Sequence, residues 1–322
     1  MTGLLQPVSV KQPGVSFSGK TSMKVLVTGG NGQIGYELLT LLKGSDILHY
    51  APARNQLDLT IPRQVEEVIA GYQPTIVVNA AGYRSPARAE IEPSRCFALN
   101  RDAPAALARI CDQHKAVLIH ISSWRVFDGT KQEAYTIKDI PNPSCVLGSS
   151  FWQGEQQVRE NCSRHIILRL SWVISPRGRN RLTSILSSLV RGEPVLVSAS
   201  SRGRPTPADD VARVILAIMR QIDCNAQVWG TCHYNSAETV DEESLAKVIL
   251  AEASQYHDFP ANTAALFPES NSNNRTVNAC LDTTHLRNTF GIHSKFWHSG
   301  VARLVKDIYA TDKNKREQEG RG

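Results

Sequence analysis

A glycine-rich segment near the amino end constrains most strongly what this chain can fold into. Residues 24–28 (KVLVT) are apolar and β-branched, and residues 33–43 place apolar side chains along one helical face. The segment between them completes both G-x-G-x-x-G and T-G-x-x-G-x-x-G, ending at Gly35. Such glycines let the backbone approach a pyrophosphate, whose charge is attracted by free N–H groups of the following helix. The sequence therefore predicts a dinucleotide-binding βαβ unit rather than a simple tight turn.

Strand-like and helix-like segments continue to alternate up to residue 173. Apolar runs at 46–50, 75–82, 116–123 and 165–173 predict strands, and segments 62–72, 93–114 (interrupted by Pro104) and 148–161 predict helices. The strands are apolar throughout, which is typical of a parallel sheet covered on both faces. We therefore expect an α/β fold, a Rossmann-type doubly wound parallel sheet with a smaller α/β substrate-binding lobe.

The chain has 322 residues, which suits two domains. We expect residues 23–173 to form the NAD(P)-binding domain. Residues 174–311 are expected to form mainly the substrate lobe, partly interleaved with the first domain. Residues 1–22 contain no apolar core of a signal peptide and are expected to be a flexible leader, and the polar residues 312–322 a flexible tail.

Composition excludes several other classes of protein. The chain carries 36 Lys and Arg against 30 Asp and Glu, a net charge of +6, but these charges are dispersed. Dispersed charge argues against a nucleic-acid partner, and no apolar run approaches the ~20 residues that span a membrane. Seven widely spaced cysteines without C-x-x-C indicate a reducing, cytoplasmic location and no metal site.

The residues after the second expected strand bear on the choice of cofactor. Segment 49–54 (HYAPAR) contains no acidic residue to bind a ribose 2′-hydroxyl, whereas Arg54 is suited to a 2′-phosphate. This favours NADP(H), with NAD(H) as the alternative. A role for Arg54 as an ordinary exposed loop cation stays open at this point.

Ten short motifs occur along the chain in a characteristic order. They are TGGNGQIG at 28–35, LDLT at 57–60, NAAGY at 79–83, HISS at 120–123, VFDG at 126–129, GE at 154–155, LRLSWV at 168–173, RPTPADDVA at 204–212, LDT at 281–283 and FGI at 290–292. Together they resemble an extended short-chain dehydrogenase/reductase and, within it, the dTDP-4-dehydrorhamnose reductase family. The resemblance runs from about Lys24 to about Ile308. It implies a Rossmann domain, a nucleotide-sugar-binding lobe and hydride transfer from NADPH to C4 of a keto sugar.

The resemblance also implies site residues, which we transfer position by position. The cofactor positions are Gly29, Gly32, Gln33, Ile34, Gly35, Asp58, Ala80, Ala81 and Tyr83. The catalytic serine or threonine after the fourth strand corresponds to Ser123. The nucleotide-sugar side corresponds to Trp172, Arg204 and Arg275.

The chain departs from this family at the catalytic Tyr-x-x-x-Lys. In the family the tyrosine protonates the nascent alkoxide, and the lysine lowers the tyrosine pKa and holds the nicotinamide ribose. The Tyr position is Leu147 here and the Lys position is Phe151. Both still point to the same side of one helix, where they are expected to form an apolar wall. Neither side chain can donate a proton.

Neighbouring positions have changed as well. The family pattern Ser-Thr-Asp-Tyr-Val-Phe-Asp-Gly becomes Ser-Ser-Trp-Arg-Val-Phe-Asp-Gly, with Trp124 and Arg125 in place of an acid and an aromatic residue. A literal Tyr-x-x-x-Lys at 309–313 lies in the polar tail, and we interpret it as chance. His120 is expected to be a core histidine with its hydrogen bonds satisfied.

These observations leave three hypotheses. In the first, the chain keeps the nucleotide scaffold but is non-catalytic, acting as a regulatory or assembly subunit for a protein partner. It resembles, at fold level only, the regulatory subunit of methionine adenosyltransferase. In the second, it is an oxidoreductase with a repurposed pocket that takes its proton from water, Ser123 or Tyr83. The third is a non-redox reaction of a sugar nucleotide, for which no base is evident. The first is favoured, and a homodimer is left open.

Overall fold

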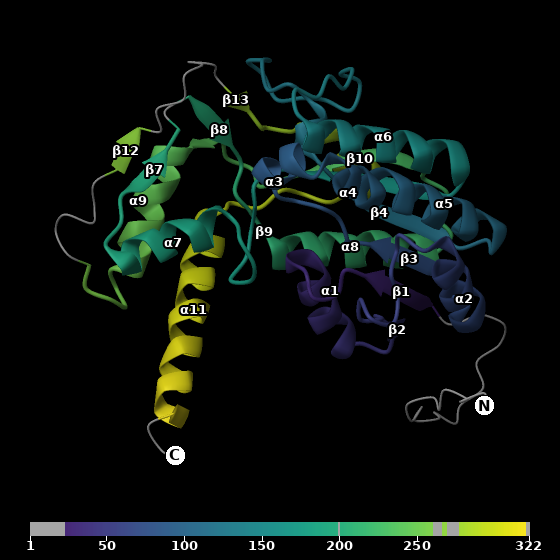
Figure 1. Cartoon of the computed structure of the whole chain (residues 1–322), viewed down its shortest axis with the longest axis horizontal. Coiled ribbons are helices and arrows are strands. Elements are labelled where there is room, and N and C mark those ends of the chain that lie inside the picture. Colours follow the sequence, from purple (N-terminus) through teal and green to yellow (C-terminus); the bar gives the residue numbers. More distant parts are fainter. Residues whose placement is uncertain (1–22, 199, 260–265, 269–276, 320–322) are drawn as a thin grey trace.

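The computed structural model describes residues 23–198, 200–259, 266–268 and 277–319, and it centres on a parallel sheet (Figure 1). The six strands follow the order β10-β5-β4-β3-β1-β2, and every neighbouring pair is parallel. They are β1 (Lys24–Thr28), β2 (Leu48–Tyr50), β3 (Ile76–Asn79), β4 (Val117–Ser123), β5 (His165–Leu170) and β10 (Gly230–Tyr234). Strand order reverses between β1 and β3, which opens a crevice at their carboxyl ends. The predicted doubly wound sheet is confirmed.

Helices cover both faces of this sheet. One layer consists of α1 (Gln33–Lys43), α8 (Ala208–Asp223) and α10 (Thr284–Phe290), and the other of α2 (Pro62–Tyr72), α5 (Ala103–Gln113) and α6 (Val146–Asn161). Successive residues of β1 point to opposite layers: Val25 and Val27 pack with the first, and Leu26 packs with the second. Because both faces are buried, the strands are apolar throughout rather than alternating.

The expected helix at 93–114 is not regular. It consists of α4 (Pro93–Phe97), a π-helical segment η1 (Ala98–Asp102) and α5. Pro104 lies in the first turn of α5, which directly follows the π-helical segment, and it has no N–H to donate back into that segment. The irregularity therefore lies just before the proline, and it is a π-bulge of the kind often found beside functional sites.

A second apolar core lies outside the sheet domain. It joins α7 (Arg181–Arg191), β7 (Val195–Val197), α9 (Glu242–Ala253) and α11 (His298–Glu319). Short strands complete this part: β6 (Val173–Ile174), β8 (Ser201–Gly203), β9 (Thr206–Pro207), β11 (Val240–Asp241), β12 (Leu266–Pro268) and β13 (Val277–Asn278). Residues after 173 divide between the two cores, since α8, β10 and α10 pack with the sheet. Figure 1 labels α8 and β10 beside the other strands.

The two ends of the chain differ from each other. Residues 1–22, expected to be a flexible leader, lie outside the described residues. The expectation of a tail without regular structure is wrong for its first part, because α11 continues to Glu319. The segment is rich in Lys, Arg, Glu and Gln, all strong helix formers, and it extends a helix whose earlier turns are anchored by Val301 and Val305 in the second core. Apolar periodicity alone did not reveal this extension.

Candidate functional site

The glycine segment forms a tight turn between β1 and α1. Gly29 has φ +73°, a left-handed conformation that favours glycine, and its carbonyl accepts a 2.8 Å bond from the Gly32 N–H. A side chain at Gly35 would overlap the Gly29 carbonyl oxygen. No side chain caps the first turn of α1, which starts at Gln33 and contains Ile34. The turn thus offers a close backbone approach and free N–H groups, which suit an anionic dinucleotide.

The residues after β3 lie against this turn. A side chain at Gly29 would come within 2.7 Å of the Ala80 carbonyl and 2.6 Å of the Ala81 nitrogen. Asn79 holds the strand ends together: its Oδ1 accepts from the Thr28 hydroxyl at 2.7 Å and from the Ala81 N–H at 3.3 Å. The predicted cofactor positions on β1 and β3 are therefore adjacent, and only glycine fits between them.

Arg54 and Asp58 lie in the loop that follows β2. Arg54 is exposed. Exposure is compatible both with binding of a 2′-phosphate and with an ordinary loop cation. Asp58 Oδ1 accepts from the hydroxyl of Thr60 at 2.7 Å and from its N–H at 2.9 Å. These bonds, with a smaller contribution from the charge of Arg54, lower the pKa of Asp58. Arg54 therefore lies close enough to influence the carboxylate of Asp58.

Asn100, in the π-helical segment, was missed by the sequence reasoning. It is buried, its Oδ1 accepts from the Tyr83 N–H at 2.7 Å, and its Nδ2 donates to the Tyr83 carbonyl at 3.1 Å and to the Ser150 hydroxyl at 3.0 Å. It therefore holds the backbone of the loop after β3 in place. The only signal in the sequence was a polar residue inside an otherwise apolar helical pattern.

Arg84 was also missed. It follows Tyr83 directly, and its Nη1 lies 3.5 Å from Gln33 Oε1. Its Nη2 is 3.7 Å from the position that a side-chain carbon would take at Gly32. The guanidinium therefore lies beside the glycine turn, and partial burial there lowers its pKa. Nothing in the local sequence distinguishes Arg84 from a surface cation.

Leu147 and Phe151 lie on α6 and are both buried, with 1% and 8% of their surfaces exposed. They belong to one apolar cluster, the pocket cluster, which also contains Trp124, Val126, Phe127 and Tyr135. Tyr83, Cys145 and Trp152 pack against it. Both side chains are thus buried in one apolar cluster.

Ser123 ends β4 and is followed by Trp124 and Arg125. The Ser123 hydroxyl accepts from the Arg125 N–H at 3.3 Å and caps the short turn η2 (Trp124–Val126). Trp124 is buried in the pocket cluster, and the Arg125 guanidinium lies 4.9 Å from the centre of its indole ring. Burial lowers the pKa of Arg125. A bulky aromatic residue and a cation therefore follow Ser123 directly.

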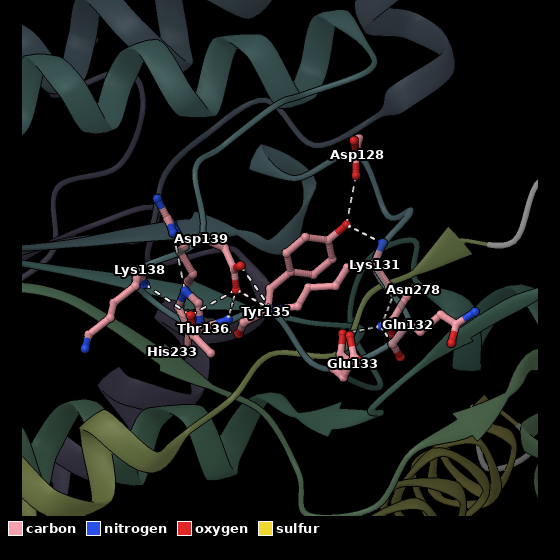
Figure 2. A network of polar contacts seen from close by, with 11 residues as sticks. Asp128, Lys131, Gln132, Glu133, Tyr135, Thr136, Lys138, Asp139, His233 and Asn278 are labelled. Carbon is pink, nitrogen blue, oxygen red and sulfur yellow. Dashed lines mark hydrogen bonds and ion pairs between the residues drawn. The ribbon is translucent and has the colours of Figure 1, made fainter.

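Tyr135, a member of the pocket cluster, and Lys131, whose Nζ lies 5.9 Å from the centre of the Tyr135 ring, are both engaged by other contacts (Figure 2). The Tyr135 hydroxyl donates to Asp128 at 2.8 Å and accepts from the Lys131 N–H at 3.1 Å. Lys131 Nζ pairs with Asp139 at 2.8 Å. Asn278 closes the loop by donating to the carbonyls of residues 131, 132 and 133. Burial raises the pKa of Tyr135, so this phenol stays protonated and donates to Asp128 within the loop.

A buried charge cluster centres on Glu155 of α6. Glu155 on α6 is fully buried and receives two bonds from Arg169, at 2.8 and 2.6 Å, and one from the Ser122 hydroxyl at 2.6 Å. Arg159 adds a fourth at 2.8 Å. Burial raises the pKa of Glu155, but the two guanidinium groups and these bonds outweigh it, and the net pKa is lowered. The cluster fixes α6 against β4 and β5.

Two of the expected nucleotide-sugar residues lie near each other, because Trp172 packs on Gly203, the residue before Arg204. Trp172 adopts φ +37° after β5, and its indole packs so closely on Gly203 that a side chain there would overlap the ring. Arg204 donates to the Thr239 hydroxyl at 3.2 Å and to the Leu281 carbonyl at 3.1 Å. Trp172 packs against both the pocket cluster and the second core. Arg275 lies outside the described residues.

The alternative Tyr-x-x-x-Lys lies elsewhere. Tyr309 is on α11, packs against the second core and stacks on Tyr256 with ring centres 5.7 Å apart. The side chain of Lys313 lies outside the described part of the chain. The phenol of this pair therefore belongs to the second core, not to the pocket cluster.

With this geometry in place, comparison with known proteins identifies the family. A family model described as the RmlD substrate binding domain matches residues 23–310. The chain belongs to this family. It is also 31% identical over 300 residues to dTDP-4-dehydrorhamnose reductase from Aggregatibacter actinomycetemcomitans, covering 89% of this chain and 98% of that protein. The dTDP-4-dehydrorhamnose reductase of Sinorhizobium fredii is 32% identical, covering 88% and 97%. The resemblance predicted from the motifs is confirmed at the level of the family.

A solved structure supports the same assignment. The crystal structure of dTDP-4-dehydrorhamnose reductase from Bacillus anthracis, determined in complex with NADP, matches this RmlD family member with a TM-score of 0.79. The two are 26% identical, and the match covers 90% of this chain and 100% of that one. Within the described residues, no helix is long and apolar enough to cross a membrane.

Proposed function

We propose that this RmlD family member binds NADP(H) but does not carry out standard 4-keto reduction, and serves as a regulatory or non-catalytic scaffold protein. The observation that carries the proposal is the burial of Leu147 and Phe151 in one apolar cluster. They occupy the positions that correspond to the tyrosine and lysine of the family.

The chemistry explains why these positions matter. NADPH, when bound, supplies the hydride that would reduce a carbonyl carbon. The carbonyl oxygen then needs a proton, and a positioned general acid accelerates such a step by about 10²–10⁴-fold. Leu147 and Phe151 have no proton to give, and Lys131 and Tyr135 are engaged in the loop. Leu147 and Phe151 are buried side chains without a proton to donate, so the general acid of the standard reaction has no equivalent at these two positions.

Binding of the cofactor is supported by a different part of the molecule. The turn from Gly29 to Gly35 keeps its tight geometry, and the first turn of α1 is uncapped. These residues would hold the pyrophosphate. Arg54 is exposed beside Asp58, where it suits a 2′-phosphate and favours NADP(H) over NAD(H). A nucleotide-sugar-like ligand near Trp172 and Arg204, a protein partner and a cytoplasmic location belong to the same proposal.

The test is a redox assay combined with a binding assay on the full chain. We expect calorimetry to detect NADP⁺ binding, and we expect no oxidation of NADPH above background with a dTDP-4-keto sugar. The double variant Leu147→Tyr/Phe151→Lys should then oxidise NADPH at about 10²-fold or more above background. Stoichiometric turnover by the wild type would refute the non-catalytic role, and absence of dinucleotide binding would refute the scaffold itself.

One observation favours a second candidate, an NADPH-dependent oxidoreductase with a repurposed site. The Tyr83 hydroxyl is buried and has no hydrogen-bond partner in the described part of the protein, and Tyr83 packs against the pocket cluster. In this candidate, a keto sugar nucleotide or related carbonyl compound accepts hydride at carbon, and Tyr83 transfers its proton to the resulting alkoxide oxygen. A Tyr83→Phe variant would then lose at least about 10²-fold in rate while cofactor affinity is retained.

A further inference from the structure

The guanidinium of Arg84 lies at the mouth of the glycine turn. Its Nη1 is 3.5 Å from Gln33 Oε1, and its Nη2 is 3.7 Å from the position of a side-chain carbon at Gly32. These residues belong to the last position of the turn and the first of α1. Arg84 itself follows β3, 51 residues later in the sequence. Sheet topology therefore places a cation where the backbone already offers free N–H groups.

This cation has no counter-charge in the described part of the chain. Arg84 forms no ion pair there, whereas the next arginine along, Arg88, pairs with Glu92 at 2.9 Å, and Arg95 pairs with the same carboxylate at 3.1 Å. The Arg84 side chain is open to solvent on one side, and its neighbours displace water on the other. An anion in the adjoining space would give this guanidinium, which remains exposed, a charge-assisted partner.

Gln33 holds Arg84 in this position. Its side chain is buried, its Oε1 faces Arg84, and its Nε2 donates to the Arg177 carbonyl at 3.0 Å. The Arg177 guanidinium stacks on Tyr36, 3.4 Å from the ring centre, so the 177 loop is itself anchored to α1. Gln33 is therefore oriented from both ends, and its acceptor oxygen points to Arg84.

We propose that Arg84 binds the pyrophosphate of the dinucleotide over the glycine turn, as the charged partner of the backbone N–H groups. The planar guanidinium presents parallel N–H donors that match two phosphate oxygens. The inference rests on the proposed function, because it assumes that the turn binds a dinucleotide. It adds a specific residue, and it predicts a contact that NADP(H) and NAD(H) share.

The test compares both dinucleotides on the full chain by calorimetry. Arg84→Ala should weaken NADP⁺ and NAD⁺ by the same factor, about 10- to 100-fold, as expected for loss of a charge-assisted hydrogen bond. Arg84→Lys should recover part of the affinity, since lysine keeps the positive charge but lacks the two parallel N–H donors of the guanidinium. The matched control is Arg88→Ala, which removes an arginine of the same segment that is paired away from the turn and should change affinity by less than about twofold.

The outcomes separate this inference from the proposed function. If the wild type binds neither dinucleotide, both fail. If the wild type binds but Arg84→Ala binds equally well, only the role of Arg84 is wrong. If Arg84→Ala weakens NADP⁺ alone, Arg84 contacts the 2′-phosphate and the pyrophosphate assignment is overturned. Circular dichroism and thermal unfolding of each variant confirm that the exposed substitution leaves the fold intact.

Discussion

His120 shows what a single residue contributes in this molecule. Its imidazole is buried on β4, with Nδ1 3.1 Å from the Asn79 amide nitrogen. Its Nε2 has no hydrogen-bond partner in the described part of the protein. The expectation of a buried core histidine is therefore correct, but the expectation that both ring nitrogens are hydrogen-bonded is wrong. Burial lowers the pKa of His120 to about 4. The folded protein thus keeps this ring neutral over a range where the unfolded chain protonates it.

This shift predicts a pH dependence of stability. Between the ordinary histidine pKa of about 6.5 and the folded value of about 4, the unfolded chain binds the extra proton. The free energy of unfolding should therefore fall as the pH is lowered through this window, with His120 contributing a slope of about 1.4 kcal/mol per pH unit. Urea unfolding at several pH values should show that the free energy of unfolding changes less steeply with pH in His120→Gln than in the wild type. His293→Gln, at an exposed site, serves as control, and equal slopes would contradict the prediction.

At the scale of elements, the position of α6 depends on its close approach to the π-helical segment η1. A side chain at Gly154 would overlap the carbonyl oxygen of Asn100, so only glycine permits this contact. The same segment presents Asn100 to the Tyr83 backbone. The position of Leu147 and Phe151 relative to the loop after β3 therefore depends on one small residue, Gly154, which lies about one turn beyond Phe151 and about two turns beyond Leu147 on α6.

Two glycine substitutions test this packing. Gly154→Ala should lower the free energy of unfolding by about 3 kcal/mol or more, because the added carbon meets rigid backbone rather than a side chain that can move. Gly71→Ala, near the end of α2, has nothing within 4 Å of the added carbon and should be neutral or stabilising by up to about 1 kcal/mol. Urea unfolding of both variants decides the matter, and equal effects would show that α6 relaxes freely.

At the scale of the whole molecule, polar contacts join parts that are distant in the sequence. The Glu155 cluster links α6, β4 and β5, and Arg169 continues to His233 on β10 at 3.3 Å. His233 Nδ1 in turn lies 3.1 Å from the Tyr135 carbonyl in the loop of Figure 2. Burial and the charge of Arg169 lower the pKa of His233 to about 3, so it stays neutral beside the guanidinium. The sheet, α6 and the loop of Figure 2 are thus held as one unit.

Removing the central carboxylate should show its importance. Glu155→Gln leaves Arg169, which is 2% exposed, without a full counter-charge, and should lower the free energy of unfolding by about 3–5 kcal/mol. Glu67→Gln breaks the ion pair with Arg63, in which the Arg63 side chain is 88% exposed and the Glu67 side chain 60%. This change should lower the free energy of unfolding by less than about 0.5 kcal/mol. The comparison is made by urea unfolding at neutral pH. A small loss in Glu155→Gln would mean that the cluster is replaceable.

Much of the fold could be predicted because its signals are local. Apolar runs predicted the strands of the sheet up to β5, and the glycine spacing from Gly29 to Gly35 predicted the turn. Both follow from rules about neighbouring residues, namely steric freedom at glycine and burial of apolar side chains. The helix after residue 311 was missed because its sequence has propensity without an apolar face.

The sequence by itself determined the parallel sheet, the glycine turn and the apolar character of Leu147 and Phe151, since each depends on a residue and its immediate neighbours. Only the tertiary structure decided that the Arg84 guanidinium lies beside Gly32 and that Asn100 is hydrogen-bonded to the Tyr83 backbone. The same holds for the bonds of Tyr135 to Asp128 and of Lys131 to Asp139. The contacts of Arg84 and Asn100 join segments that come together only when parallel strands bring their carboxyl ends to one edge. Their energies depend on three-dimensional distance and burial, which no local pattern encodes.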